Sequence, residues 1–236
     1  MAWLLVLLTI FLLWMLSLWK VLYSSKSTLS NVLTYSNDKG FKRQNVLLVL
    51  AHPDDESMFF SPTIQFFISK GHNIHILCMS TGNADGKGYI RKEELYRACA
   101  ILKVPPQRVK VLDHPNLQDG LKEQWQHNLL ATIIGEEVNM REIDKIITFD
   151  SHGISGHQNH RDVHHGLCML LQEKRPEVEA WELISTSILR KYSGPVDIWL
   201  SIFYSLYWPH GQTCCSLNTH PHKCYLAMAE HESQWV

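Results

Sequence analysis

The feature that most constrains this chain is an unbroken apolar run, residues 46–51, that ends in a histidine and three acids. A short run of this kind, without polar alternation, is typical of a parallel strand covered on both faces. Ligands of open α/β sheets bind beyond the carboxyl ends of such strands, where His52 stands. Because Pro53 turns the chain, His52 and Asp55 can converge on one cation while Asp54 faces whatever the cation holds. One alternative stays open, since acids here also suit the start of a following helix.

A second cluster of the same kind follows later in the chain. Residues 145–150 form another short apolar run, and the loop after it contains Gly153, Gly156, His157 and His160. Glycines in such a loop let the backbone approach a ligand closely. Two histidines and one carboxylate are the ligand set of catalytic zinc and of non-haem iron, and both ions keep positions open for water or substrate. The two clusters together predict a metal centre at the strand ends.

The rest of the chain alternates strand and helix patterns. Strands are predicted over residues 73–79, 109–112, 143–149 and 182–189, and helices over residues 58–69, 91–102 and 124–138. This alternation predicts a Rossmann-like, doubly wound α/β fold with a mostly parallel sheet. With 236 residues, the chain can form one such domain with an N-terminal segment set aside.

The N-terminal segment predicts a membrane anchor. Residues 2–23 are predicted to form one transmembrane helix and residues 24–43 a tether, which leaves residues 44–236 for the catalytic domain. Residues 2–19 are apolar apart from Thr and Ser, and are long enough to cross a hydrocarbon core of about 30 Å. A signal peptide would need basic residues before this run and a small-residue cleavage site after it. The basic residues lie on its carboxyl side, which predicts a single-pass protein with its domain in the cytosol.

Composition limits the partners of the domain. The formal net charge is −1 and there is no basic tract, so nucleic acid is not predicted as a partner, and no particular protein partner is indicated. The six cysteines lack metal-type C-x-x-C spacing and are interpreted as reduced thiols. Residues 196–208 are aromatic and apolar but short. They are interpreted as a helix or loop resting on the bilayer, or as an ordinary core helix.

Two motifs carry a resemblance to a known family, Ala-His-Pro-Asp-Asp-Glu at 51–56 and Gly-His-Gln-Asn-His at 156–160. They resemble the zinc-dependent de-N-acetylases of the LmbE-like superfamily. Further matches occur at residues 82–83, 91–95, 189–192 and 231–234. With the apolar N-terminus, the chain is similar in particular to the branch that deacetylates N-acetylglucosaminylphosphatidylinositol, the second step of GPI-anchor assembly.

The resemblance implies a location and a substrate. It implies a hydrolase at the endoplasmic reticulum membrane, with its catalytic domain facing the cytosol and a glycolipid substrate in the bilayer. Two alternatives stay open, namely de-N-acetylation of another N-acetylglucosamine conjugate and a membrane-tethered binding protein without turnover.

The chemistry of amide hydrolysis and the resemblance assign roles to individual residues. Zn²⁺ would be held by His52, Asp55 and His160, with Fe²⁺ or Mn²⁺ as other possible metals. Asp54 would be the general base. His157 would stabilise the developing oxyanion and protonate the leaving nitrogen. A general base beside the ligands favours a hydrolase over an iron-dependent oxidative enzyme.

Arg91 is interpreted as the substrate-binding residue. A phosphodiester favours a bidentate guanidinium, and Arg91 follows a glycine-containing loop at a predicted helix start. The alternative is an ion pair of Arg91 with Glu94 or another surface acid. The chain departs from relatives that carry a tyrosine at the position of Ser155 and an aspartate at that of Asn159. A tyrosine-assisted step is therefore not expected here.

Overall fold

The computed structural model describes residues 2–23, 43–120, 124–174, 177–191, 193, 196–207, 218 and 220–235. The chain divides into two units, of which one comprises Lys42–Thr186 with His220–Val236 and the other Met1–Phe41 with Ser187–Thr219. The predicted tether, residues 24–43, lies outside the described residues except for Arg43.

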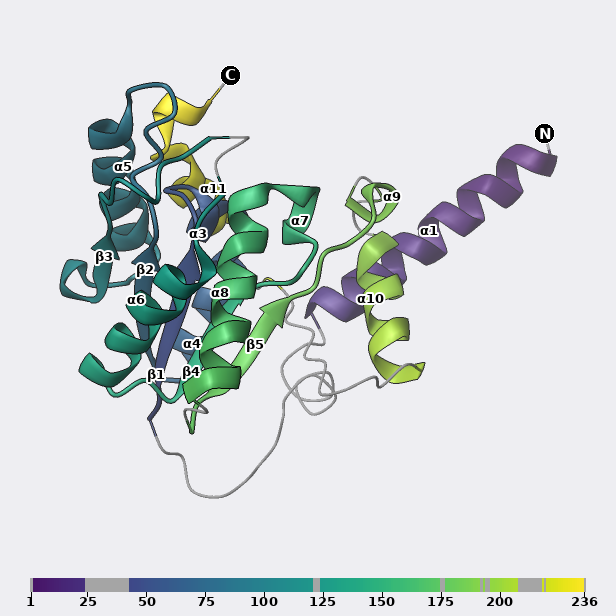
Figure 1. Ribbon diagram of the computed structural model, residues 1–236. Coiled ribbons are helices and arrows are strands. Elements are labelled where there is room, and N and C mark those ends of the chain that lie inside the picture. The colour runs from purple at the N-terminus through teal and green to yellow at the C-terminus, as the bar shows by residue number, and fades with distance from the viewer. Residues whose placement is uncertain are drawn as a thin grey trace. The chain divides into compact units, whose positions relative to one another are not determined.

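The larger unit is built on a five-stranded sheet (Figure 1). Its strands are β1 (Asn45–Leu50), β2 (Asn73–Cys78), β3 (Val109–Val111), β4 (Lys145–Phe149) and β5 (Glu179–Leu183). The spatial order is β3-β2-β1-β4-β5, and every neighbouring pair is parallel. The chain builds outward from β1 to β3 and then returns to add β4 and β5 on the other side. The point between β1 and β4 is thus the topological switch point, where open sheets bind ligands. The predicted doubly wound α/β fold is confirmed.

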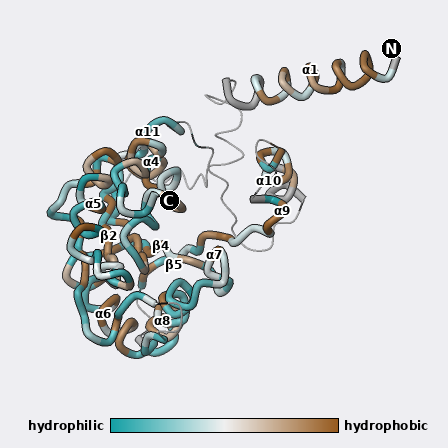
Figure 2. Tube along the Cα trace, turned by 90° about the horizontal axis from the view of Figure 1, so that it is seen from above, coloured by the Kyte–Doolittle hydropathy of each residue, from teal (hydrophilic) through white to brown (hydrophobic). Residues whose placement is uncertain are grey.

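Helices cover both faces of this sheet (Figure 2). One face carries α4 (Ser61–Ser69), α5 (Gly88–Ile101) and α11 (Pro221–Ala229), and the other carries α6 (His127–Met140) and α8 (Gln158–Lys174). The central strand β1 is covered on both sides, and Val46 to Ala51 are each at most 2% exposed. This is why its sequence is apolar without alternation. Gly166 lets α8 approach α6, because a Cβ there would lie 2.5 Å from Leu130 Cβ.

One predicted helix is interrupted. The helix expected over residues 58–69 is two helices, α3 (Asp55–Met58) and α4, with the break at Phe59 and Phe60. The Phe60 side chain at this break is fully buried and packs in the core. Pro62 then lies in the first turn of α4, where proline is tolerated because the turn needs no amide donor there. The other helices are shifted by a few residues, since α5 begins at Gly88 and α6 at His127.

The last predicted strand is placed wrongly. Residues 182–189 were expected to be extended, but β5 covers Glu179–Leu183 and is followed by a short helix, α9 (Ile188–Lys191). Pairing with β4 sets the strand, and Leu183 lies opposite Phe149, where β4 ends. Beyond it, the Asp150 carboxylate accepts hydrogen bonds from the Ser185 amide and hydroxyl, both at 2.6 Å, which turns the chain. β5 is an edge strand whose residues are all exposed or half-buried, so its apolar pattern is weak.

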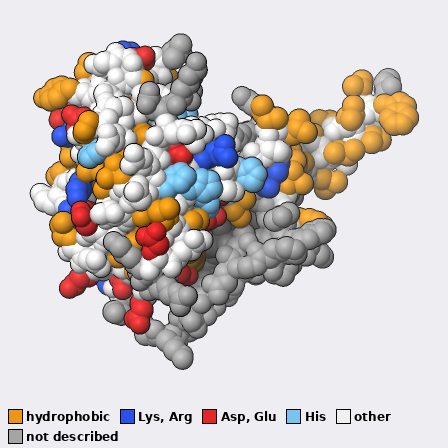
Figure 3. All heavy atoms as spheres, in the orientation of Figure 1, with side chains coloured by type: hydrophobic (Ala, Val, Ile, Leu, Met, Phe, Trp, Pro, Cys, Tyr) orange, Lys and Arg blue, Asp and Glu red, His pale blue; other side chains and the backbone are white. Residues whose placement is uncertain are grey.

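The smaller unit contains α1 (Ala2–Tyr23), α9 and α10 (Val196–Tyr207). Apolar side chains along α1 are exposed, and they stand out in Figure 3. The helix expected over residues 2–23 is present as α1, but within the described residues no helix has the length and apolar character needed to cross a membrane.

The aromatic segment forms a helix over Val196–Tyr207, which both interpretations of residues 196–208 allowed. Val196, Leu200 and Phe203 share one face of α10, and each is at least 45% exposed. Arg190 pairs with Asp197 of this helix at 2.6 Å. Contact of α10 with a bilayer stays a prediction.

Candidate metal centre and active site

The loop after β1 holds its acid in place with backbone hydrogen bonds. Asp55 Oδ2 accepts the amide hydrogens of Ala51 at 3.0 Å and of His52 at 2.8 Å, which ties the carboxylate to the end of the strand. α3 starts at Asp55, but the residue in the N-cap position, Asp54, makes no side-chain capping bond. The acids of this loop therefore stand at the start of a helix, as the alternative reading of the motif expected. The carboxylate of Asp54, however, does not cap that helix.

The hydrogen bonds of His52 fix its tautomer. Its Nε2 lies 3.1 Å from Asp119 Oδ1 and 3.1 Å from Asn159 Oδ1, and both oxygens are acceptors. The ring hydrogen therefore belongs on Nε2, and Nδ1 keeps its lone pair. Nδ1 lies 4.0 Å from Asp55 Oδ2. Burial alone would lower the pKa of His52, but the hydrogen bond to Asp119 and the charge of Asp55 raise it.

His160 is oriented in the same way from the opposite side. Its Nδ1 lies 3.2 Å from the Gly153 carbonyl oxygen, which leaves the lone pair on Nε2. That nitrogen lies 3.2 Å from Asp55 Oδ1, and the ring is stacked on Phe149 with centroids 4.0 Å apart. Burial opposes the charge of Asp55, but His160 and then His52 hold its pKa below the ordinary value. The two lone pairs thus face one carboxylate, a donor arrangement that fits a divalent cation.

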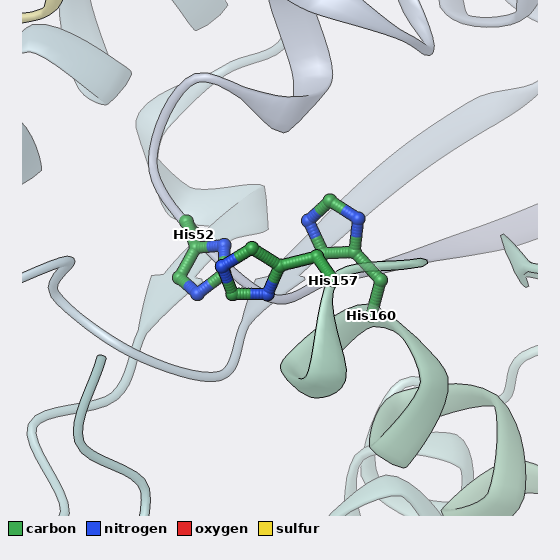
Figure 4. A group of neighbouring side chains, drawn as sticks. All are labelled: His52, His157 and His160. Atoms are coloured by element: carbon green, nitrogen blue, oxygen red, sulfur yellow. The ribbon is translucent and has the colours of Figure 1, made fainter. Parts of the chain in front are cut away.

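His157 completes a group of three histidines (Figure 4). One donor atom from each of His52, His157 and His160 lies within 4.8 Å of the others, and the His157 ring is 4.8 Å from His52 and 5.0 Å from His160. His157 Nδ1 accepts the Asn159 amide hydrogen at 3.3 Å, which leaves Nε2–H as a donor. Burial and the neighbouring histidines lower the pKa of His157. The structure brings together all three predicted ligands and the predicted oxyanion partner.

Asp54 lies beside this group in a strained conformation. Its φ of 125° is rarely adopted by residues other than glycine, and such strain is concentrated at functional sites. Burial and the charge of Asp55 raise the pKa of Asp54 to about 7, although Arg91 opposes the shift. A carboxylate with a pKa near neutrality suits a general base.

Arg91 is buried and pairs with two acids. It donates to Asp54 Oδ2 at 3.2 Å and to Asp119 Oδ2 at 3.0 Å, and also to the carbonyl oxygens of Gly82 and Pro53. Its Nε is buried and has no hydrogen-bond partner among the described residues, so one donor is not used by the protein. Arg91 does form ion pairs, but with Asp54 and Asp119, whose side chains are 17% and 11% exposed, and not with Glu94 or a surface acid as the alternative expected. Substrate binding by Arg91 stays a prediction.

Sequence reasoning missed Asp119. This residue follows β3 in a loop and bridges His52 and Arg91. Burial works against its charge, but the hydrogen bond and charge of His52, followed by Arg91, lower the pKa of Asp119 to about 2. Like Asp55, Asp119 is an acid that follows the carboxyl end of a predicted strand. It lies eight residues after the end of β3, too far for the local sequence pattern to single it out.

A second missed pair ties the C-terminal segment to the loop after β1. His231 Nε2 lies 2.6 Å from Glu56 Oε1, and both side chains are fully buried. The carboxylate of Glu94 accepts hydrogen bonds from the Ser233 amide and hydroxyl at 2.8 and 2.6 Å. The residues after α11 are thereby fixed next to α3 and α5, the two helices that begin at the candidate site.

The fold and this site define an α/β protein with a cluster of histidines and a carboxylate, able to hold a metal ion, at the switch point of a parallel sheet. The family model for PIG-L, GlcNAc-PI de-N-acetylase, matches residues 47–170, which is more than half of the chain. The chain belongs to this family.

Relatives and solved structures agree with this assignment. A probable N-acetylglucosaminyl-phosphatidylinositol de-N-acetylase of Schizosaccharomyces pombe is 40% identical over 156 residues, which cover 65% of this chain and 62% of that protein. The chain thus spans less than two thirds of that relative. A Dictyostelium discoideum protein of the same description is 34% identical over 221 residues, with 82% and 86% covered. The N,N'-diacetylchitobiose deacetylase structure from Pyrococcus horikoshii shares the fold, with a TM-score of 0.58, 16% identity, and 92% and 78% covered.

Proposed function

We propose that this protein is a zinc-dependent hydrolase that removes the acetyl group from N-acetylglucosaminylphosphatidylinositol. One observation carries the proposal, namely that the lone pairs of His52 Nδ1 and His160 Nε2 both face Asp55 while Asp54 lies beside them. His52, Asp55 and His160 would hold the ion. Bound Zn²⁺ supplies a nucleophile at neutral pH and polarises the acetamide carbonyl.

The chain's own groups then handle the protons of the reaction. Asp54 accepts a proton as the general base, and its strained backbone keeps the carboxylate turned away from the cap of α3. His157 Nε2–H donates a hydrogen bond to the oxygen that gains negative charge, and the proton that Asp54 has accepted is available for the leaving nitrogen. Asp119 contacts both the His52 ring and Arg91. It therefore positions His52, a proposed metal ligand, and Arg91, which pairs with the proposed base.

The substrate assignment comes from the relatives, whose descriptions name N-acetylglucosaminyl-phosphatidylinositol. This activity would place the protein in GPI-anchor biosynthesis. The test supplies N-acetylglucosaminylphosphatidylinositol to membranes that carry the chain and measures the free amine product and acetate together. Release of both in equal amounts supports the proposal. Turnover of a water-soluble N-acetylglucosamine conjugate but not of the glycolipid would favour the other-conjugate alternative.

Binding of the glycolipid without either product would identify a binding protein instead. Metal analysis of the same preparation separates zinc from iron or manganese. Iron with no acetate release would favour oxidative chemistry over hydrolysis.

Membrane attachment at the endoplasmic reticulum through α1 is also part of this proposal. Apolar side chains along α1 are exposed, which supports contact with a bilayer, although no helix among the described residues has the length and apolar character needed to cross one. Alkaline carbonate extraction of isolated membranes distinguishes an integral anchor, which stays in the pellet, from a helix that rests on the surface.

A further inference from the structure

A second group of potential metal ligands lies one helical turn beyond His160, outside the candidate active site. It consists of His164 and Cys168 on α8 and Glu182 on β5, and one donor atom of each lies within 4.8 Å of the others. Figure 1 shows α8 running alongside the sheet edge that β5 forms. Among the described residues, this is the one such group that includes a thiol.

The spacing of the two helical residues suits a shared ligand. Positions four apart lie on one face of an α-helix, as in metal sites built on i, i+4 pairs. Cys168 Sγ lies 3.6 Å from His164 Nε2. A tetrahedral zinc ion, with bonds of about 2.3 Å to sulfur and about 2.0 Å to nitrogen, would separate these donors by roughly 3.5 Å.

The tautomer of His164 is fixed in the required form. Its Nδ1 lies 3.3 Å from the Phe149 carbonyl oxygen, so the hydrogen belongs there and the Nε2 lone pair is left on the side of Cys168. A backbone carbonyl orients His160 in the same way. A carbonyl behind the ring is the usual outer partner of a histidine that binds metal.

Glu182 supplies the third donor and the route from solvent. Its Oε1 lies 3.2 Å from His164 Nδ1, so the carboxylate must turn toward Cys168 to reach an ion at Nε2. The Glu182 side chain is 45% exposed and free of the core, whereas that of His164 is 11% exposed. An ion can therefore enter from the side of β5 and keep a coordination position for water. Binding of a cation would release the proton of the Cys168 thiol into solvent.

We propose that His164, Cys168 and Glu182 form a second binding site for a thiophilic divalent cation such as Zn²⁺, separate from the centre at His52 and His160. Nitrogen, thiolate and carboxylate are all zinc ligands. An ion here would join α8 to the edge strand β5. The site is independent of the proposed deacetylase activity, because none of its three residues belongs to that centre.

The test titrates Co²⁺ into the purified, metal-stripped full chain in detergent. The wild-type protein should bind about two equivalents and show a thiolate-to-cobalt charge-transfer band in the near ultraviolet, since the proposed catalytic ligands include no sulfur. Cys168→Ser should lose the band and one equivalent. Cys224→Ser, which changes the other half-buried cysteine among the described residues, should keep both.

Two further variants make the test decisive. His160→Ala should lose one equivalent but keep the band, which separates failure of the first centre from failure of the second. Glu182→Gln alters an exposed edge-strand residue, and should weaken the cobalt affinity reported by the band about 10-fold or more. A single equivalent without a band in the wild-type protein, a band that survives Cys168→Ser, or a Glu182→Gln affinity equal to that of wild type would overturn the proposal.

Discussion

At the scale of single residues, Asp54 is the position where binding and chemistry can be separated. It is proposed to accept a proton and not to hold the metal, so Asp54→Asn should keep zinc and lose most of the turnover. A positioned general base contributes about 10² to 10⁴ in rate, and the amide cannot accept that proton at neutral pH. The measurement is the turnover number beside the zinc content of one preparation.

The matched control for this change is Asp85→Asn. Asp85 is an exposed acid in the loop after β2, and its replacement should leave both quantities unchanged. A parallel loss of zinc and turnover in Asp54→Asn would make Asp54 a ligand. Near-normal turnover would mean that another group, with His157 the first candidate, is the base.

Asp119 allows a second prediction at this scale. Its carboxylate contacts His52 Nε2 and Arg91, so Asp119→Asn should loosen a ligand and the neighbour of the base together. Loss of such an outer partner typically costs about 10- to 100-fold in metal affinity or activity. Zinc competition with a chelator measures the first effect, and acetate release the second. Unchanged zinc affinity with normal turnover would show that Asn159 alone suffices to orient His52.

Some residues of the candidate site could be predicted from the sequence and others could not. His52, Asp55 and His160 were predictable because each lies directly beyond a strand or at a helix start, where the local pattern fixes its place. Asp119 and the pair formed by Glu56 and His231 were not predictable in this way. Their contacts join residues 67 and 175 positions apart, and no local pattern encodes such a distance.

At the scale of elements, the loop between β2 and α5 offers a matched pair of glycines. Gly82 and Gly86 have nearly equal φ values of 68° and 71°, but a Cβ on Gly82 would lie 2.5 Å from the Arg91 guanidinium, whereas one on Gly86 would meet nothing within 4 Å. Both Ala variants should carry a backbone cost of about 1–3 kcal/mol. Gly82→Ala should also displace Arg91, whose hydrogen bonds to charged groups are worth about 1.5–3 kcal/mol each.

Thermal unfolding and acetate release of the two variants check this prediction. Gly82→Ala should be the less stable and the less active of the pair. Equal losses in both would show that backbone strain alone matters and that Arg91 can move without consequence.

Strong periodicity decided which elements could be predicted. β1 was predicted within one residue because it is buried on both faces, and β4 within two. The break at Phe59 and Phe60 and the position of β5 depend on tertiary contacts, namely the burial of Phe60 and the register against β4. An edge strand also needs fewer apolar residues, so the sequence pattern of β5 was too weak to predict where the strand begins and ends.

The segment after α11 gives a prediction with a pH dependence. Burial alone would lower the pKa of His231, but the hydrogen bond and charge of Glu56 raise it above 6.5. A raised pKa in the folded state stabilises the fold fully below pH 6.5, and this contribution is lost as the pH rises through the folded value. His231→Ala should lower the free energy of unfolding by about 3–5 kcal/mol just below pH 6.5, since it leaves a buried acid without its partner. The difference from wild type should shrink as the pH rises.

Unfolding curves of both proteins across this pH range provide the measurement. His222→Ala, at an exposed position of α11, is the control and should stay close to wild type. A difference that grows with pH would contradict the assigned charge of His231.

At the scale of the whole molecule, the orientation in the membrane is open to a direct test. The basic residues near the apolar segment, Lys20, Lys26, Lys39, Lys42 and Arg43, all follow it, so the positive-inside rule predicts a cytosolic domain. Protease added to sealed microsomes should digest residues 44–236 and leave an anchor fragment, while a lumenal marker protein stays intact. Replacing these five residues by Gln should make the orientation mixed, because the charge bias that sets it is removed. Full protection of the domain in the wild-type chain would reverse the orientation and expose its cysteines to an oxidising compartment.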